Sequence, residues 1–544
     1  MKLSLRLLPA LFVLIVFPLA AQDSPEQEST PETEAQEQEF LSEAESQDDT
    51  DDQAASSMDD WLYVIVDFEF FIDGRTRPSA LMYNGELKTG EKLRGQASLD
   101  KYIRDKTQLL INQRVLKDNA VITYSVGEQA EDGSYPVTLE IFVEDSWNLI
   151  ALPKPQYTTH TGFELTIKAR DYNFLGTMNP LRVDLGYRHD EKGRNSFQFE
   201  VYSDTPFRAA GLTWNLRFDN LFWYRPDVEQ PFFYRNITGL SMELPFRTTT
   251  FIFGFEEYFN FNEENAYRYQ EFYHKNFQDG LYMTSKMYTS WKIPTGLMVS
   301  RYGELTYTPG ISATFNHELP DWPLLPFRKG PFLGLSHSLG FEKIDWHANY
   351  RDGLSVSVSN GYTCDFFRLN NGDEPVSASL TLHTAGYFII SKFFGISSRL
   401  QYRQWFYHDP DYYEMAGDNL RGISDKSIRA DYMLSLNMDF PLRVLLFTPS
   451  KWFAKWKTNF FDVELQIAPV IDLALYHDPK LAISFHPKNI AASGGIELIV
   501  FSDFMRNLYI RLGYAANLRE AAATKNIFES SDDREIYLIM GHFY

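Results

Sequence analysis

Cysteine is almost absent from this chain of 544 residues, because Cys364 is the only one. A single cysteine cannot form an intramolecular disulfide. Small secreted domains that cannot bury a sufficient core usually depend on several disulfides. The sequence therefore excludes a small disulfide-stapled scaffold.

Catalytic and metal-binding motifs are also missing. The chain contains no HExxH, no GxSxG and no P-loop, and its 11 histidines are scattered. HELPD, which begins at His317, lacks the second histidine that a zinc-binding helix needs. We therefore expect no enzyme activity, no cofactor, no metal and no nucleic-acid partner. The alternatives are a lipase or protease embedded in an outer membrane, and calcium binding by loop acids such as Asp409 and Asp411.

Long apolar runs are confined to the N-terminus. Lys2 and Arg6 introduce an apolar run from Leu7 to Ala20, and small residues follow it. A membrane-spanning helix needs about 20 predominantly apolar residues, so this run is short. We predict a cleaved signal peptide at 1–21, with a single membrane anchor as the alternative.

Basic residues are absent from the segment that follows. Residues 22–60 hold 15 Asp or Glu and no Lys or Arg. Such a composition buries too little apolar surface to offset the entropy of ordering. We predict an acidic disordered linker, with a docking tail for a basic partner as the alternative.

Residues 61–147 have the pattern of one small α+β domain. The stretch 62–74 is rich in β-branched and aromatic residues, and helical spacing follows within 98–118. Two further strands begin at Val121 and Tyr135, with Gly133 in the turn between them.

Residues 148–544 alternate between apolar and polar side chains in many short segments. In one of them Leu181, Val183, Leu185 and Tyr187 alternate with Arg182, Asp184, Gly186 and Arg188. Strands of this kind with aromatic ends are typical of a wall between lipid and water. We predict a transmembrane β-barrel of about 16 antiparallel strands, preceded by the small α+β domain; a soluble β-sandwich is the alternative.

Two motifs carry a family resemblance. IDGRTRPSALMYNGELKTGEKL, residues 72–93, is similar to the first turn and helix of a POTRA domain. Leu420, Arg421, Gly422 and Ile423 match an Arg-Gly loop motif and precede an alternating strand. A POTRA-like domain before such a barrel resembles the BamA/TamA superfamily of outer-membrane assembly and translocation proteins.

The resemblance implies a loop that folds back into the barrel lumen. Because a buried guanidinium needs acceptors, Arg421 requires an inward carboxylate, and Asp472 stands at the matching position. Two positions depart from the family pattern. Asn437 stands where an acid is usual, and Met178 stands where a second glycine is common.

The resemblance also implies a bacterial outer-membrane location, with the POTRA-like domain in the periplasm, and a seam between the first and last barrel strands. We predict the first strand around Phe163–Ala169 and the last at Ile536–Tyr544. The predicted seam residues are Phe163, Leu165, Ile167, Ile536, Leu538, Met540 and Tyr544. Strand pairing at this seam would insert other proteins into the membrane. The alternative is a translocation pore or transporter gated by the Arg-Gly loop. The expected partners are outer-membrane lipids, unfolded outer-membrane proteins, and periplasmic or lipoprotein subunits.

Overall fold

The computed structural model describes most of the chain beyond residue 60. The described residues are 61–158, 162–189, 193–226, 231–262, 280–321, 324, 328–406, 414–415, 417–423, 428–451, 461–478, 489–504, 506, 509–524 and 534–540. The predicted signal peptide, the predicted acidic linker and Tyr544 lie outside these residues.

The N-terminal part of the described chain is a four-stranded sheet covered by two helices, which we call the module. Its strands lie in the order β2-β1-β4-β3, with β1 and β4 parallel. The elements are β1 (Leu62–Asp73), α4 (Pro78–Asn84), β2 (Lys92–Arg94), α5 (Gln96–Asn112), β3 (Val121–Val126) and β4 (Ser134–Glu144). Helix α5 is shorter than the 98–118 region suggested, because Arg114 adopts a positive φ of 54° just beyond its end.

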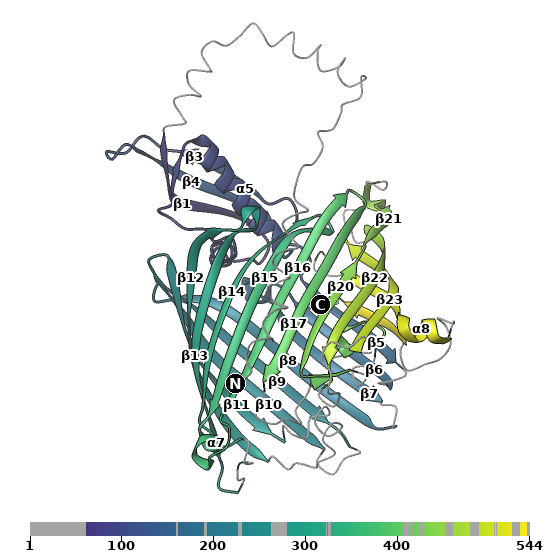
Figure 1. Cartoon of the computed structure of the whole chain (residues 1–544). Coiled ribbons are helices and arrows are strands. Elements are labelled where there is room, and N and C mark those ends of the chain that lie inside the picture. The colour runs from purple at the N-terminus through teal and green to yellow at the C-terminus, as the bar shows by residue number, and fades with distance from the viewer. Residues whose placement is uncertain are drawn as a thin grey trace.

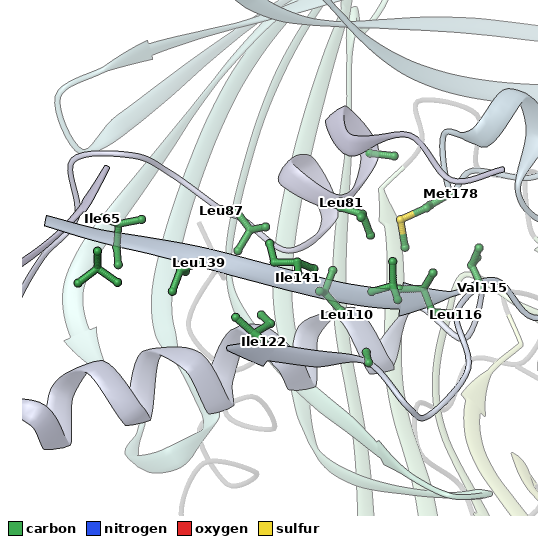
Figure 2. Packing of buried hydrophobic residues seen from close by; sticks show 14 of the residues in the cluster. Ile65, Leu81, Leu87, Leu110, Val115, Leu116, Ile122, Leu139, Ile141 and Met178 are labelled. Carbon is green, nitrogen blue, oxygen red and sulfur yellow. The ribbon is translucent and has the colours of Figure 1, made fainter. Parts of the chain in front are cut away.

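The core of the module lies between its sheet and its helices (Figure 2). Leu81 of α4 and Leu110 of α5 are fully buried against Leu139 and Ile141 of β4. Met178, which comes from a barrel turn, joins the same core and is 5% exposed. The module therefore shares its hydrophobic core with the barrel.

The rest of the described chain forms a closed antiparallel barrel, which confirms the predicted fold class. Its strands are β5 (Leu149–Thr158), β6 (Gly162–Asp171), β7 (Leu181–His189), β8 (Asn195–Ala209), β9 (Leu212–Tyr224), β10 (Phe232–Phe246), β11 (Thr249–Phe261), β12 (Leu281–Met298), β13 (Glu304–Glu318), β14 (Phe332–His347), β15 (Tyr350–Asp365), β16 (Val376–Ser391), β17 (Phe394–Phe406), β20 (Tyr432–Asp439), β21 (Leu442–Phe447), β22 (Val463–His477), β23 (Ile490–Ser502), β24 (Tyr509–Asn517) and β25 (Arg534–Met540).

Short elements occupy some of the connections. They are η2 (Phe174–Gly176), η4 (Ser300–Tyr302), α7 (Phe366–Asn371), η6 (Gly417–Asn419), η8 (Pro449–Lys451), α8 (Leu518–Thr524), and the two-residue strands β18 (Glu414–Met415) and β19 (Arg429–Ala430). Among the described residues, no helix has the length and apolarity needed to cross a bilayer.

The wall holds more strands than the expected number of about 16. Strands β20 and β21 share one position, since both pair with β17 and with β22. This arrangement leaves an even number of positions, as antiparallel closure requires. Many hairpins at one rim have short turns. Turns therefore take up fewer residues than the expected number of about 16 strands assumed, and more residues lie in strands.

The two faces of the barrel wall differ in chemistry. Ile167 and Leu185 are register partners on the outer face and are 44% and 48% exposed. The neighbouring pair, Lys168 and Asp184, lies on the inner face, and the two groups are 3.9 Å apart. An apolar exterior around a charged interior is the arrangement that a lipid-embedded barrel requires.

Aromatic rings form a band across five neighbouring strands near the rim away from the module. Contacts run from Phe163 through Tyr187, Phe197 and Tyr224 to Phe232, with ring centroids 4.9–6.5 Å apart. Such a girdle marks a membrane–water interface.

The module sits on one end of the barrel, where α5 leans over the rim (Figure 1). We call this end the module-side rim; its contacts come from the β6–β7, β14–β15 and β23–β24 turns. Arg77 donates its backbone N–H to the carbonyl of Gly176 at 2.9 Å. Asn112 donates to Asp345 at 2.9 Å and accepts from the backbone N–H of Trp346 at 3.0 Å.

Two arginines bind reciprocally across this interface. Arg114 of the module donates to the carbonyl of Arg506 at 2.7 Å and stacks on Trp346 at 4.1 Å. Arg506 of the barrel donates to the carbonyl of Leu116 at 3.1 Å and pairs with Asp118. Burial lowers the pKa of Arg114 to about 10, and the nearby Arg506 charge lowers it as well. Two like charges lie close together because carbonyls, a carboxylate and an aromatic face surround them.

We expect Arg506→Ala to loosen the module from the rim. The variant loses hydrogen bonds to charged groups, each worth about 1.5 to 3 kcal/mol, so opening should become at least about tenfold more frequent. Hydrogen exchange of residues 108–118, measured by mass spectrometry, checks this. Arg301→Ala is the control, since Arg301 pairs with Asp352 on the same rim. Unchanged exchange in the Arg506 variant would contradict the assigned interface.

Candidate functional site

The Arg-Gly segment lies inside the barrel. Residues 417–423 follow β18 and are packed against inward-facing side chains of β20 and β22. Leu420 and Ile423 are 1% and 6% exposed, and they share an apolar cluster with Met433 and Ala474. The apolar residues of the motif therefore anchor the segment to the wall.

Gly422 allows the segment to approach the wall closely. Its φ is +72°, a conformation that favours glycine. A Cβ at this position would lie 2.5 Å from the backbone carbon of Ala515 on β24. A larger residue would push the segment away from the wall.

Arg421 is fully buried, with 0% exposure, and binds Asp472 of β22 through three groups. Its backbone N–H and its Nε donate to Asp472 Oδ2 at 2.8 and 2.9 Å. Its Nη2 donates to Asp472 Oδ1 at 2.5 Å. The carboxylate therefore receives the side-on, bidentate fork of the guanidinium and fixes the loop backbone as well.

Two further carboxylates complete the site. Arg421 Nη1 donates to Asp439 of β20 at 2.6 Å and to Glu497 of β23 at 3.1 Å. Arg511 of β24 donates to Asp439 at 2.8 Å and pairs with Glu497. We call Arg421, Asp439, Asp472, Glu497 and Arg511 the arginine cage.

All five members of the arginine cage are 3% exposed or less. Two guanidinium groups face three carboxylates, so each charge has a partner of opposite sign. Removing one partner from a buried ion pair costs about 3 to 5 kcal/mol, because the remaining charge is left uncompensated. Arg421 therefore holds the loop firmly to the wall as long as its carboxylate partners are present.

The last strand is attached to the same site. Tyr537 of β25 donates its hydroxyl to Glu497 at 2.5 Å and is 2% exposed. Glu535 of β25 accepts the backbone N–H of Gly422 at 3.1 Å. The loop and β25 are thus connected through two side chains.

The structure brings Arg421 and Asp472 together, as the sequence analysis placed them. Asp439, Glu497, Arg511 and Tyr537 were not predicted from the sequence. Asp439 lies an even number of positions from the other inward-facing residues of the alternating strand, and this spacing could have predicted that it faces the lumen. Asn437 of β20 donates to the carbonyl of Asn419 at 2.9 Å and so holds the loop backbone.

The predicted first strand of the barrel was wrong by one hairpin. Strand β5 (Leu149–Thr158) borders β25, whereas Phe163, Leu165 and Ile167 lie on β6. Strand β5 was not predicted because its two prolines interrupt the alternating pattern. Phe163 belongs to the aromatic band instead. Ile536, Leu538 and Met540 do lie on β25, at the seam.

The direction of the β5 backbone groups follows from its register. The carbonyl of Asn148 accepts the N–H of Tyr172 at 2.9 Å, next to the pair formed by Leu149 and Asp171. Antiparallel partners alternate between hydrogen-bonded and non-hydrogen-bonded pairs, and this register has no shift. The residues of β5 whose backbone groups point to β25 are therefore Leu149, Ala151, Pro153, Pro155 and Tyr157.

Two of these five positions are prolines, which have no N–H to donate. Strands β8, β10, β12, β13 and β22 hold one proline each, but β5 holds two with the same orientation. The seam therefore lacks two consecutive donors on its β5 side.

Within the described ranges, no group of three or more His, Cys, Asp or Glu could hold a metal ion.

We expect Arg421→Ala to free the loop while the barrel stays closed. The variant leaves three buried carboxylates with Arg511 as their remaining cage cation, at a cost of about 3 to 5 kcal/mol to loop docking. Limited proteolysis should cut the loop faster, while the gel mobility of the unboiled protein stays that of a folded barrel. Arg421→Lys should restore protection only in part, because it lacks the planar fork.

Arg217→Ala is the matched control for this experiment. Arg217 of β9 donates to Glu256 of β11 at 3.0 Å, in another part of the lumen. Loop cleavage at the wild-type rate in the Arg421→Ala protein would contradict the fastening role.

Comparisons with known proteins give structural neighbours only. No family model and no curated protein matches the sequence. The chain is similar to BamA from Haemophilus ducreyi lacking POTRA domains 1–3, with 12% identity, 88% of this chain and 84% of that chain covered, and a TM-score of 0.35. It is also similar to CdiB from Acinetobacter baumannii, with 10% identity, coverage of 88% and 74%, and a TM-score of 0.42. For CdiB from Escherichia coli the identity is 8%, the coverage 95% and 99%, and the TM-score 0.38.

Proposed function

We propose that this protein inserts other β-barrel proteins into a bacterial outer membrane by strand pairing at the seam between β5 and β25. The module then lies in the periplasm, and the module-side rim faces that compartment. The observation that carries the proposal is the absence of donors at Pro153 and Pro155. No covalent chemistry is required.

The physical reason is the cost of unpaired backbone groups in lipid. A barrel normally satisfies each backbone N–H and C=O between neighbouring strands. Each acceptor left without a donor costs about 1 to 3 kcal/mol, so this seam is weaker than an ordinary strand pair. A weak seam can part and exchange its partner for a strand of another polypeptide.

The outer faces of the seam strands fit a lipid-side event. Ile536 on β25 is 64% exposed and Leu149 on β5 is 56% exposed. Inside the barrel, Tyr537 binds Glu497 of the arginine cage, and Glu535 binds the backbone of Gly422. A strand entering here meets lipid on one side and the lumen on the other.

A translocation pore is the second candidate function. The observation that favours it is the buried Arg-Gly segment, which occupies part of a lumen with charged walls. Release of this segment would widen the passage. In that case the seam stays closed during function.

Locking the seam with a disulfide distinguishes the two functions. We expect Ala151→Cys combined with Ile536→Cys or Leu538→Cys to cross-link in a Cys364→Ser background. Cross-linking should stop the insertion of newly made outer-membrane proteins, measured as their folded, heat-modifiable fraction in cells, and a reductant should restore it. The matched control is the Ala151→Cys single variant under the same oxidant. Normal insertion with a fully cross-linked seam would favour the pore.

A further inference from the structure

Polar side chains interrupt the apolar outer face of three neighbouring strands, β11, β12 and β13. Glu257 of β11 pairs in register with Ser285 of β12. Along β11 Glu257 lies between the outward residues Phe255 and Phe259, which are 43% and 37% exposed. Outward positions of a lipid-embedded barrel are normally apolar, because a charge there costs free energy in hydrocarbon. A carboxylate on this face therefore marks a candidate binding site.

Hydrogen bonds join Glu257, Ser285 and His317 in a chain, which we call the outer-face cluster. Ser285 donates its hydroxyl to Glu257 Oε2 at 2.8 Å. His317 Nε2 of β13 lies 2.9 Å from the same hydroxyl oxygen. Because the single hydroxyl proton goes to Glu257, the imidazole donates its Nε2–H to Ser285. The Nδ1 atom of the neutral ring is then left as an acceptor.

The outer-face cluster offers acceptors and no further donor. Within the part of the chain that the structure describes, Ser285 is the one group that donates to Glu257, and no Lys, Arg or His forms an ion pair with its carboxylate. The available atoms are Glu257 Oε1 and His317 Nδ1, and the cluster carries one negative charge. A ligand that donates hydrogen bonds or carries a positive charge complements it, whereas a phosphate is repelled.

The outer-face cluster lies in the half of the membrane away from the module. Phe261, the last residue of β11, pairs with Tyr234, which follows Phe232 of the aromatic band by two residues. Glu257 precedes Phe261 by four residues, which is about 14 Å along a tilted strand. Polar groups of lipids in that leaflet can therefore reach the cluster.

We propose that the outer-face cluster binds the polar group of a membrane lipid that carries N–H or O–H donors, in the leaflet away from the module. Two sources share this chemistry: the ammonium headgroup of phosphatidylethanolamine, and the amide and hydroxyl groups of an acylated amino sugar. Met287 and Phe315, outward residues beside the cluster, are 55% and 40% exposed and contact the acyl chains of the same lipid.

The outer-face cluster is remote from the seam. Five strands, β6–β10, separate β11 from β5 on one side of the barrel, and β12 and β13 form the left edge of the barrel in Figure 1. The inference therefore goes beyond the proposed function and does not depend on it.

Native mass spectrometry of the full chain in detergent tests the lipid class. The probes are phosphatidylethanolamine, phosphatidylcholine with the same acyl chains, and lipid A, which is an acylated amino sugar. Phosphatidylcholine is the matched control, because its quaternary ammonium group has no N–H. We expect phosphatidylethanolamine or lipid A to be retained at several-fold higher occupancy than phosphatidylcholine, and the better retained of the two identifies the source. Equal retention of all three lipids would overturn the inference.

Variants test the residues. Glu257→Gln removes the negative charge and should lower retention of the preferred lipid several-fold, while the gel mobility of the unboiled protein stays that of a folded barrel. Glu243→Gln is the matched control, since Glu243 of β10 lies 4.0 Å from Lys292 on the lumen side of the wall, and it should leave retention unchanged. Wild-type retention in the Glu257 variant would overturn the assignment. A dimer that forms only with Glu257 present and retains no lipid would assign the cluster to a protein contact and overturn it as well.

Discussion

The ion-pair cluster around Arg421 determines how the inside of this barrel is organised. A fully buried guanidinium must have its donors satisfied, and here it binds carboxylates from three wall strands. The site also reaches β25 through Tyr537. The loop, the wall and the last strand are therefore connected by one set of charged hydrogen bonds. Displacement of the loop would therefore alter the hydrogen bonds that hold β25 at the seam.

The seam is the place where barrel closure is least complete. A closed antiparallel wall has no edge, and its stability comes from continuous strand pairing. Prolines at 153 and 155 remove two donors at one boundary only. At this boundary β5, which lacks two backbone donors, borders β25, which is bound to the loop and to the arginine cage inside the barrel. This asymmetry links the proposed function to particular backbone groups.

The module belongs to the same structural unit as the barrel. Met178 of a barrel turn is buried in the module core, and Arg114 and Arg506 bind across the rim. The side chain of Met178 packs among the buried residues of the module. Transfer of its side chain into an apolar core is favourable by about 1.5 to 3 kcal/mol. Movement of the module would have to break these contacts together.

The local features of this fold can be predicted from the order of the amino acids alone. Period-two alternation predicted barrel strands, and the pattern around Arg421 pointed to Asp472, because side-chain parity and motif order are local properties. Only the tertiary structure showed that Glu497 and Arg511 complete the cage, since closure of the wall brings distant strands together. The tertiary structure also showed that β5 is the strand that borders β25 at the seam. Prolines are visible in a sequence, but which neighbour loses their donors depends on register.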